Sequence, residues 1–177
     1  MSSTTKAFKE VMRCFAAGVT VVTTRGSGPS AYGVTASSFT SVSLEPRLVL
    51  VCLDNRLSGL DQFHNAGRFV VNILAEDQEE VSAHFATPGS DRSERCGYYA
   101  QAEGDLPLLA NSLAAMECSL ETTYPGGDHT ILVGSVDWVR RGNRFGRHGP
   151  LLYYRGRYAR LEPEPITAMT EADRSDL

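Results

Sequence analysis

Hydroxyl side chains are concentrated in one short segment, where they can hold a ligand without a formal charge. Six Thr and Ser residues lie between Thr35 and Ser43, directly after an extended start at Gly33. Each hydroxyl can donate a hydrogen bond to a phosphate oxygen or a ring carbonyl, and Gly33 and Ala36 leave the backbone accessible to a bulky ligand. The segment predicts a cradle for an anion or a heterocycle. The alternative is a solvent-facing strand of ordinary Ser and Thr content.

A histidine beside a glycine-rich turn is the second candidate for chemistry. His129 follows Gly127 and Asp128 between two expected strands. An accessible imidazole at such a tip can stack on a ligand ring or form a hydrogen bond to it. A solvated loop histidine is the alternative.

The other reactive side chains are too scattered to form a recognisable metal site. There is no C-x-x-C pair, each cysteine lies in or beside apolar residues, and the histidines match no zinc spacing: Cys14, Cys52, Cys96, Cys118, His64, His84, His129 and His148. A chain of this size does not need disulfide bonds to fold. We expect reduced, mostly buried thiols and no structural metal.

Length and composition indicate an ordinary globular protein. The 177 residues suit one domain, with 42% hydrophobic and 21% charged residues. A net charge of -4 disfavours a nucleic-acid binder. No apolar run approaches the ~20 residues of a membrane span, and the N-terminus lacks the order of a secretory signal. We expect a cytoplasmic protein that binds neither nucleic acid nor membrane.

Three helices are expected to help position these residues. Apolar side chains at three-to-four spacing predict an amphipathic helix over residues 5–17, and its stripe needs a partner: Phe8, Val11, Met12, Phe15 and Ala16. Shorter helices are expected over residues 58–66, with Ser58 as the N-cap, and over residues 77–85.

β-Branched and apolar runs predict the strands. They cover residues 19–24, 30–35, 47–53, 68–74, 113–123, 130–141 and 151–161. Turns over residues 25–29 and 124–129 join two hairpins, and residues 87–105 are expected to be irregular. Hairpin-like links favour a mainly antiparallel barrel with helices at its ends. We expect one domain over residues 1–161 and a flexible tail over residues 162–177.

Several motifs follow one another in order from Phe8 to Leu161. They are Phe8-x-x-x-Met12-x-x-Phe15-x-x-Gly18-Val19-Thr20-Val21-Val22, Gly33-Val34-Thr35-Ala36-Ser37-Ser38-Phe39-x-Ser41-Val42-Ser43-Leu44-x-Pro46, Leu48-Val49-Leu50-Val51-Cys52, Gly127-Asp128-His129 and Pro150-Leu151-Leu152-Tyr153-Tyr154-Arg155-Gly156-Arg157-Tyr158. Each is weak alone, but the collinear set resembles the small flavin reductases of two-component monooxygenases. The resemblance implies their fold, the FMN-binding split barrel, an antiparallel and Greek-key-like β-barrel with a few flanking helices.

The resemblance also implies a site for a flavin, FAD or FMN. It places the flavin against Thr35, Ala36, Ser37, Ser38, Cys52, Leu53, Asp54, Ser58, Gly59, His84 and Phe85. Backbone N–H groups at a helix start and hydroxyl groups are suitable donors to the phosphate and the ring. Structural alternatives remain: a small core residue for Cys52, a core aromatic for Phe85, a helix cap for Ser58 and a surface histidine for His84.

For the nicotinamide nucleotide, the resemblance implies His129 as the catalytic residue, with Tyr154 and Arg155 nearby. A solvent-facing strand residue is the alternative for Arg155. The chain departs from the family at Arg95-Cys96, where an Arg-Phe pair is expected to close the loop over the nucleotide.

The implied function is hydride transfer from NADH, or alternatively NADPH, to a flavin that then leaves for a separate monooxygenase. A homodimer with the site at its two-fold interface is also implied. FAD is slightly favoured because the hydroxyl cradle lacks an arginine, and NADH because no Lys/Arg cluster marks a 2′-phosphate pocket.

Two other functions stay open at this point. One is a non-catalytic flavin-binding sensor or carrier on the same barrel. The other is a pyridoxamine phosphate oxidase, which requires a basic phosphate-binding cluster that the sequence does not show.

Overall fold

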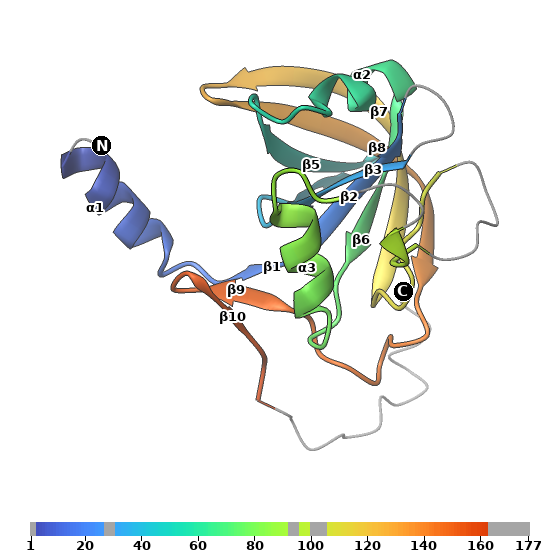
Figure 1. Cartoon of the computed structure of the whole chain (residues 1–177). Coiled ribbons are helices and arrows are strands. Elements are labelled where there is room, and N and C mark those ends of the chain that lie inside the picture. The colour runs from blue at the N-terminus through green and yellow to red at the C-terminus, as the bar shows by residue number, and fades with distance from the viewer. Residues whose placement is uncertain (1–2, 27–30, 92–95, 100–105, 163–177) are drawn as a thin grey trace.

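The computed structural model describes residues 3–26, 31–91, 96–99 and 106–162, and β-strands dominate it (Figure 1). The helices are α1 (Ser3–Met12), α2 (Leu60–Ala66) and α3 (Glu79–Ala86). The strands are β1 (Ala17–Gly18), β2 (Thr20–Arg25), β3 (Ala31–Ala36), β4 (Thr40–Leu44), β5 (Arg47–Asp54), β6 (Arg68–Ile73), β7 (Ala114–Gly126), β8 (His129–Arg141), β9 (Leu152–Tyr154) and β10 (Arg157–Ala159).

The larger sheet is antiparallel, with the strand order β3-β2-β6-β7-β8-β5-β4. Register shifts at Glu117/Cys118 and Leu120/Thr122 interrupt the long β7–β8 pairing, as β-bulges that bend a strand do. β3 and β4 follow one another in the chain but lie at opposite edges of the sheet, so the barrel stays split. The predicted mainly antiparallel split barrel is confirmed.

A smaller sheet, β1-β9-β10, lies beside the larger one. Its β9–β10 hairpin turns at Arg155 and Gly156, which have φ values of 52° and 79°. Two consecutive residues with positive φ make the tight reversal typical of a two-residue hairpin loop. The prediction of one continuous strand over residues 151–161 is therefore wrong.

The N-terminal helix is shorter than predicted and stands apart from the barrel (Figure 1). α1 ends at Met12, and every side chain from residue 3 to residue 16 is exposed. Beyond a short turn, the chain enters β1, which pairs with β9 and so cannot continue the helix. The predicted apolar stripe exists, but no described residue buries it.

The other two helices lie close to their predicted positions. α2 ends at Gly67, whose left-handed φ of 63° matches the usual glycine stop. Gly59 occupies the N-cap position of α2 without a side-chain hydrogen bond, so the prediction of Ser58 as the cap is wrong. α3 covers nearly the predicted range and packs on β3. A Cβ built at Gly33 would lie 2.7 Å from the Phe85 ring, so only glycine permits this approach.

Two clusters of buried side chains hold these layers together. In β5, buried Val49, Val51 and Leu53 alternate with half-buried residues, the pattern of a strand with one face in the core. They join a cluster with Val22, Val34, Phe63, Phe69, Val71, Leu132 and others. A second cluster under α3 contains Val19, Val21, Leu74, Phe85, Leu109 and Leu151.

One fully buried polar residue, Asn72, connects three segments of the chain. Its amide nitrogen donates to the Val21 carbonyl at 3.0 Å and to Thr23 Oγ1 at 3.1 Å. Its side-chain oxygen accepts from the Leu109 N–H at 2.9 Å. These bonds satisfy the carboxamide and fix the segment before β7 against β2 and β6.

Several expectations fall partly outside the described residues. The irregular segment 87–105 is described at 87–91 and 96–99, so Arg95 is outside, and of the tail 162–177 only residue 162 is described.

Among described residues, no three His, Cys, Asp or Glu side chains form a group that could hold a metal. In the same part of the chain, no helix is long and apolar enough to cross a membrane.

Of the cysteines only Cys118 is buried, so the prediction of mostly buried thiols is wrong. Burial raises the pKa of Cys118 to about 12.

Candidate functional site

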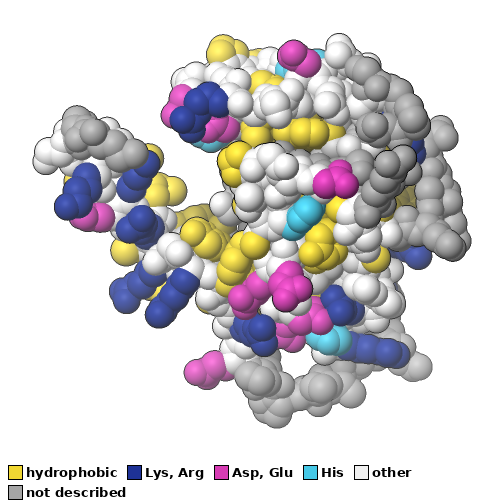
Figure 2. Space-filling view, viewed as in Figure 1, with side chains coloured by type: hydrophobic (Ala, Val, Ile, Leu, Met, Phe, Trp, Pro, Cys, Tyr) yellow, Lys and Arg dark blue, Asp and Glu magenta, His cyan; other side chains and the backbone are white. Residues whose placement is uncertain are grey.

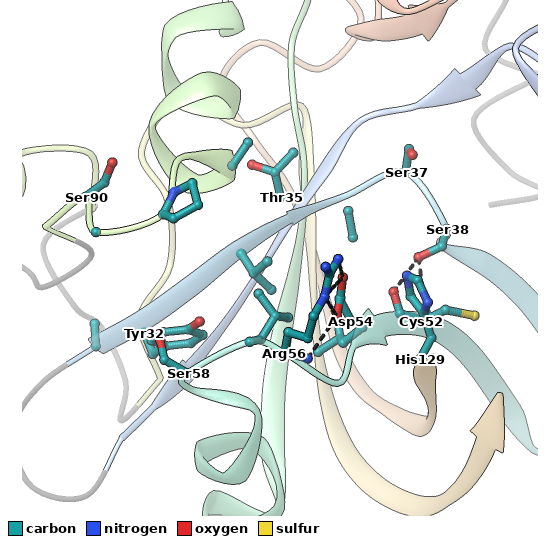
Figure 3. A pocket seen from close by; sticks show the side chains of 18 of the residues that line it. Tyr32, Thr35, Ser37, Ser38, Cys52, Asp54, Arg56, Ser58, Ser90 and His129 are labelled. Carbon is teal, nitrogen blue, oxygen red and sulfur yellow. Dashed lines mark hydrogen bonds and ion pairs between the residues drawn. The ribbon is translucent and has the colours of Figure 1, made fainter. Parts of the chain in front are cut away.

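A cavity of about 790 Å3 opens where four segments meet (Figure 3). These segments are β3 with the link that follows it, the end of β5 with the loop before α2, the end of α3 with the loop after it, and the start of β8. The lining residues are Ala31, Tyr32, Val34, Thr35, Ala36, Ser37, Ser38, Cys52, Leu53, Asp54, Arg56, Leu57, Ser58, Ala86, Pro88, Gly89, Ser90, Asp91 and His129.

Strand register brings the polar residues of this cavity together. β5 and β8 pair so that Asp54 lies opposite His129. Asn55 then ties the β7–β8 turn to the end of β5. Its N–H donates to the Asp128 carbonyl at 3.0 Å, and its side-chain oxygen accepts from Thr130 Oγ1 at 2.7 Å. The tip that carries His129 is therefore held in place over the cavity.

Asp54 and Arg56 form an ion pair on the cavity wall (Figure 3). Arg56 Nη2 lies 2.7 Å from Asp54 Oδ2, Nε lies 3.0 Å from Oδ1, and the Arg56 N–H donates to Oδ1 at 2.8 Å. These hydrogen bonds hold the pKa of Asp54 well below its usual range and raise the pKa of Arg56. The Arg56 side chain stays 88% exposed, so it can also contact an anionic ligand.

His129 is half-exposed at the rim. Its Nδ1 lies 2.7 Å from Asp128 Oδ1, and this hydrogen bond lowers the pKa of Asp128. A neutral imidazole that donates from Nδ1 keeps Nε2 as an acceptor. Nε2 then suits a ligand N–H group such as that of a carboxamide.

The hydroxyl-rich segment lines the cavity, but two of its hydroxyl protons are already used. Thr35 Oγ1 donates to the Ser82 carbonyl at 2.7 Å. Ser38 Oγ donates to the Cys52 carbonyl at 2.8 Å and accepts from the Cys52 N–H at 3.1 Å. These two residues therefore position the β3–β4 link against β5. Ser37 is exposed and has no hydrogen bond to another described residue, so its hydroxyl can turn to a ligand.

Tyr32 is the one Phe, Tyr or Trp among the described residues that line the main cavity. The Tyr32 ring packs edge-on against buried Phe63, with centroids 6.0 Å apart. Gly59 lies directly behind it, because a Cβ built there would be 2.3 Å from the ring. Gly59 therefore does not line the cavity, but its lack of a side chain gives Tyr32 its position.

Four more of the predicted ligand-binding residues lie off the lining. Phe85 is fully buried in the second core cluster, where it packs on Gly33. His84 points to the loop after α3, with Nε2 2.6 Å from the Asp91 carbonyl oxygen. Tyr154 and Arg155 lie on the β9–β10 hairpin, and the Arg155 guanidinium stacks over the Tyr154 ring.

The β9–β10 hairpin reaches the site region through two other tyrosines. A smaller cavity of about 180 Å3 shares Thr35, Ser37 and Ala86 with the main one and is also lined by Tyr153 and Tyr158. The Tyr158 hydroxyl donates to Ser82 Oγ at 2.8 Å. The hairpin therefore borders the site from the far side of the hydroxyl-rich segment.

Sequence reasoning did not identify Tyr32, Arg56, Leu57 or the residues after α3 as part of the lining. The sequence could have indicated Arg56, because an arginine two residues after an aspartate at the end of a strand can fold back and pair with that aspartate. Tyr32 carried none, since its place depends on Gly59, which comes from another part of the chain.

The described residues fit a flavin and a nicotinamide ring. The volume lies within the ~300–1,000 Å3 of small-molecule sites. Apolar and aromatic walls can contact planar rings, while Arg56, Ser37 and His129 supply a few polar contacts. Thr35, Ala36, Ser37, Ser38, Cys52, Leu53, Asp54, Ser58 and His129 all belong to the lining, and their binding roles remain predictions.

Comparison with known proteins places the chain in a family. Residues 12–162 match the family model described as "Flavin reductase like domain". Because this match covers most of the sequence, the chain belongs to the flavin reductase-like family, and the predicted family is confirmed.

Individual relatives agree with this assignment. The chain is 41% identical to the reductase component of 4-hydroxyphenylacetate 3-monooxygenase from Thermus thermophilus, over 88% of this chain and 96% of that protein. It is 40% identical to an NADH-dependent FMN reductase from Streptomyces nodosus, over 88% and 84%. The structure of the NADH:FAD oxidoreductase of Streptomyces globisporus, with NAD and FAD fragments, matches with a TM-score of 0.80, 34% identity and coverage of 91% and 94%. The chain spans 53% of the length of a probable flavin reductase from Rhizobium meliloti, to which it is 36% identical.

Proposed function

We propose that the protein is an NADH-dependent flavin reductase, which reduces FAD or FMN by hydride transfer and supplies free reduced flavin to a separate monooxygenase. The observation that carries this proposal is the cavity itself, which combines apolar residues and one tyrosine with one arginine and a histidine. The family and the names of the relatives support the same reaction.

The chemistry of hydride transfer belongs to the two bound substrates, the nicotinamide and the flavin. The chain binds and orients them. Tyr32, Val34 and Leu53 supply the wall for planar rings, and Arg56 can hold a phosphate by a charge-assisted hydrogen bond. His129 can accept a hydrogen bond from the nicotinamide carboxamide through Nε2. The requirement is a close, aligned stack of two rings, so no nucleophile or proton relay is needed.

Two features of the cavity bear on the choice of ligand. The initial preference for FAD over FMN rested on the lack of an arginine in the cradle, and Arg56 removes that reason. Among the described lining residues Arg56 is the one Lys or Arg, which is less positive charge than a pyridoxamine phosphate oxidase requires. NADH remains preferred to NADPH because no cluster of cations marks a 2′-phosphate site there.

The assembly and location of the protein are part of the same proposal. A homodimer is supported by the two edge strands, β3 and β4, and by the exposed stripe of α1. A cytoplasmic location is supported by the nicotinamide substrate and by the four unpaired cysteines.

The test is a steady-state comparison of FMN, FAD and riboflavin as acceptors, with NADH and NADPH as donors, followed by loss of the reduced nicotinamide absorbance. We expect turnover with NADH and at least one flavin. Flat traces with every flavin, together with measurable flavin binding, would instead identify a non-catalytic sensor or carrier.

A further inference from the structure

The one Lys or Arg in the described lining of the main cavity is already paired. Asp54 and Arg56 are two residues apart, and the carboxylate accepts hydrogen bonds from Arg56 Nη2 at 2.7 Å, from Nε at 3.0 and 3.3 Å, and from the backbone N–H at 2.8 Å. A guanidinium has five N–H donors in a planar fork. Its Nε–Nη2 edge, which suits a bidentate anion, therefore faces a carboxylate of the same cavity wall (Figure 3).

A second carboxylate lies close to this ion pair. Asp54 is opposite His129 in the β5–β8 register, and His129 Nδ1 lies 2.7 Å from Asp128 Oδ1. Hydrogen bonds from Arg56 hold the pKa of Asp54 well below its usual range, and the hydrogen bond from His129 lowers the pKa of Asp128. Figure 2 shows acidic, basic and histidine side chains gathered at the tip of the β7–β8 hairpin. An anionic ligand at Arg56 therefore approaches two negative charges.

The ion pair is not what holds the loop after β5. Among described residues, the Asp54 carboxylate has hydrogen bonds only to Arg56. Asn55 fixes the loop instead, because its N–H donates to the Asp128 carbonyl and its side-chain oxygen accepts from Thr130 Oγ1. Water screens an exposed ion pair, which contributes little to stability, and the Arg56 side chain is 88% exposed. The pair can therefore open for a ligand without disturbing the loop.

We propose that Asp54 competes with the phosphate of a bound flavin for the Arg56 guanidinium and so shortens the time that the flavin stays in the cavity. This role rests on the proposed function, in which Arg56 holds the phosphate of a flavin that leaves after its reduction. A phosphate on the Nε–Nη2 edge has to displace the carboxylate, whereas a phosphate on the remaining N–H donors lies beside a like charge. Both arrangements weaken the binding of a phosphorylated flavin.

The same competition favours release of the flavin. When the phosphate leaves, the Asp54 carboxylate takes its place, so the guanidinium keeps a charged partner in both states. Differences in affinity between variants of one site appear mainly in the rate of dissociation. Riboflavin has the same ring system and no phosphate, so its binding should not depend on Asp54. Riboflavin therefore separates competition at Arg56 from an effect on the part of the cavity that holds the ring.

Asp54→Asn tests the competition, because the side-chain oxygen of Asn can still accept a hydrogen bond from Arg56 but carries no charge. In fluorescence titrations, we expect the variant to bind FMN and FAD about fivefold more tightly and riboflavin within about twofold of wild type. Stopped-flow displacement should show that FMN dissociates more slowly by a similar factor. Asp61→Asn, at an exposed position of α2 outside the lining, is the matched control and should change none of these values.

The same substitution in the Arg56→Gln background completes a double-mutant cycle. There, Asp54→Asn should change the Kd for FMN less than about twofold, because the cation for which the two anions compete is missing. Equal tightening in both backgrounds would show a general effect of charge and overturn the proposal. Weaker FMN binding by Asp54→Asn, or an equal change for riboflavin, would overturn it as well.

Flavin binding and turnover are measured separately. Titration and displacement use no NADH, so a wild type that shows these shifts but does not oxidise NADH would refute the proposed function and leave the role of Asp54 intact. An active wild type whose affinity for FMN does not respond to Asp54→Asn would refute the role of Asp54 alone. A wild type that binds no flavin would refute both.

Discussion

At the scale of single residues, we propose that two lining side chains, Arg56 and His129, give the cavity its preference for ligands. Arg56 is held by four hydrogen bonds to Asp54, and most of its side chain is still exposed. His129 donates to Asp128 and keeps one ring nitrogen for a ligand. Both are therefore oriented before a ligand arrives, which reduces the entropy lost on binding.

Arg56→Gln should weaken the binding of FMN and FAD about tenfold and leave riboflavin binding unchanged. A hydrogen bond to a charged group is worth about 1.5–3 kcal/mol, and riboflavin has no phosphate to receive it. Fluorescence titration with the three flavins measures this difference. Arg47→Gln, at the other end of β5, is the matched control, and an equal loss for riboflavin would show that Arg56 does not contact the phosphate.

His129→Ala should raise the KM for NADH about tenfold and change the Kd for flavin less than twofold, because it removes about one hydrogen bond to the carboxamide. Steady-state kinetics and flavin titration measure the two effects. His64→Ala, on the exposed face of α2, should change neither value. A parallel loss of flavin and NADH binding would contradict the assigned role.

At the scale of elements, the site depends on close packing between segments that are distant in sequence. Gly59 makes room for Tyr32, Gly33 makes room for Phe85, and Asn72 ties the segment before β7 to β2 and β6. In each case a small or buried polar residue sets the distance between two elements.

Gly59→Ala should destabilise the protein by about 1–3 kcal/mol and weaken flavin binding, because its Cβ overlaps the Tyr32 ring. Denaturant unfolding and flavin titration measure both effects. The control is Gly18→Ala in β1, where a Cβ meets no atom within 4 Å. If Gly59→Ala binds flavin as wild type does, Tyr32 is not part of the binding wall.

Asn72→Ala should lower the free energy of unfolding by about 2–4 kcal/mol, because it leaves the Leu109 N–H without its buried partner and opens a small cavity. Urea denaturation measures the change. Asn65→Ala, on an exposed position of α2, provides the comparison and should change stability by less than about 0.5 kcal/mol. Similar values for both variants would argue against a structural role for the Asn72 hydrogen bonds.

At the scale of the whole molecule, the strands of the two sheets lie between Ala17 and Ala159. The family match runs from residue 12 to residue 162. Every described residue that lines the main cavity lies between Ala31 and His129. α1 is the one helix among the described residues whose own barrel does not bury any of its side chains.

Removal of residues 163–177 should leave kcat/KM unchanged and alter the free energy of unfolding by less than about 0.5 kcal/mol. Removal of residues 157–177 is the contrasting variant. It deletes β10 and the hydrogen bond from Tyr158 to Ser82, and should destabilise the protein clearly. Thermal unfolding and NADH oxidation measure both. A large loss after the shorter deletion would show that the domain extends past residue 162.

The amino-acid sequence by itself determined the family, the split barrel, most strand positions and the hairpin tip that carries His129. These features depend on local periodicity, turn residues and the order of the motifs, all of which are properties of the sequence itself. The same local rules also explain the errors. The final hairpin requires positive φ values at Arg155 and Gly156, which the flanking residues do not predict.

Only the tertiary structure decided which predicted residues face the cavity. Phe85 of α3 turns into the core because Gly33 of β3 leaves space for its ring, and Tyr32 lines the cavity because Gly59 leaves space for its ring. Arg56 lines the cavity because β5 ends at Asp54, whose carboxylate binds the Arg56 guanidinium. These placements depend on contacts between residues far apart in the chain. Unlike periodicity, the packing distances between elements cannot be inferred from any one segment of the sequence.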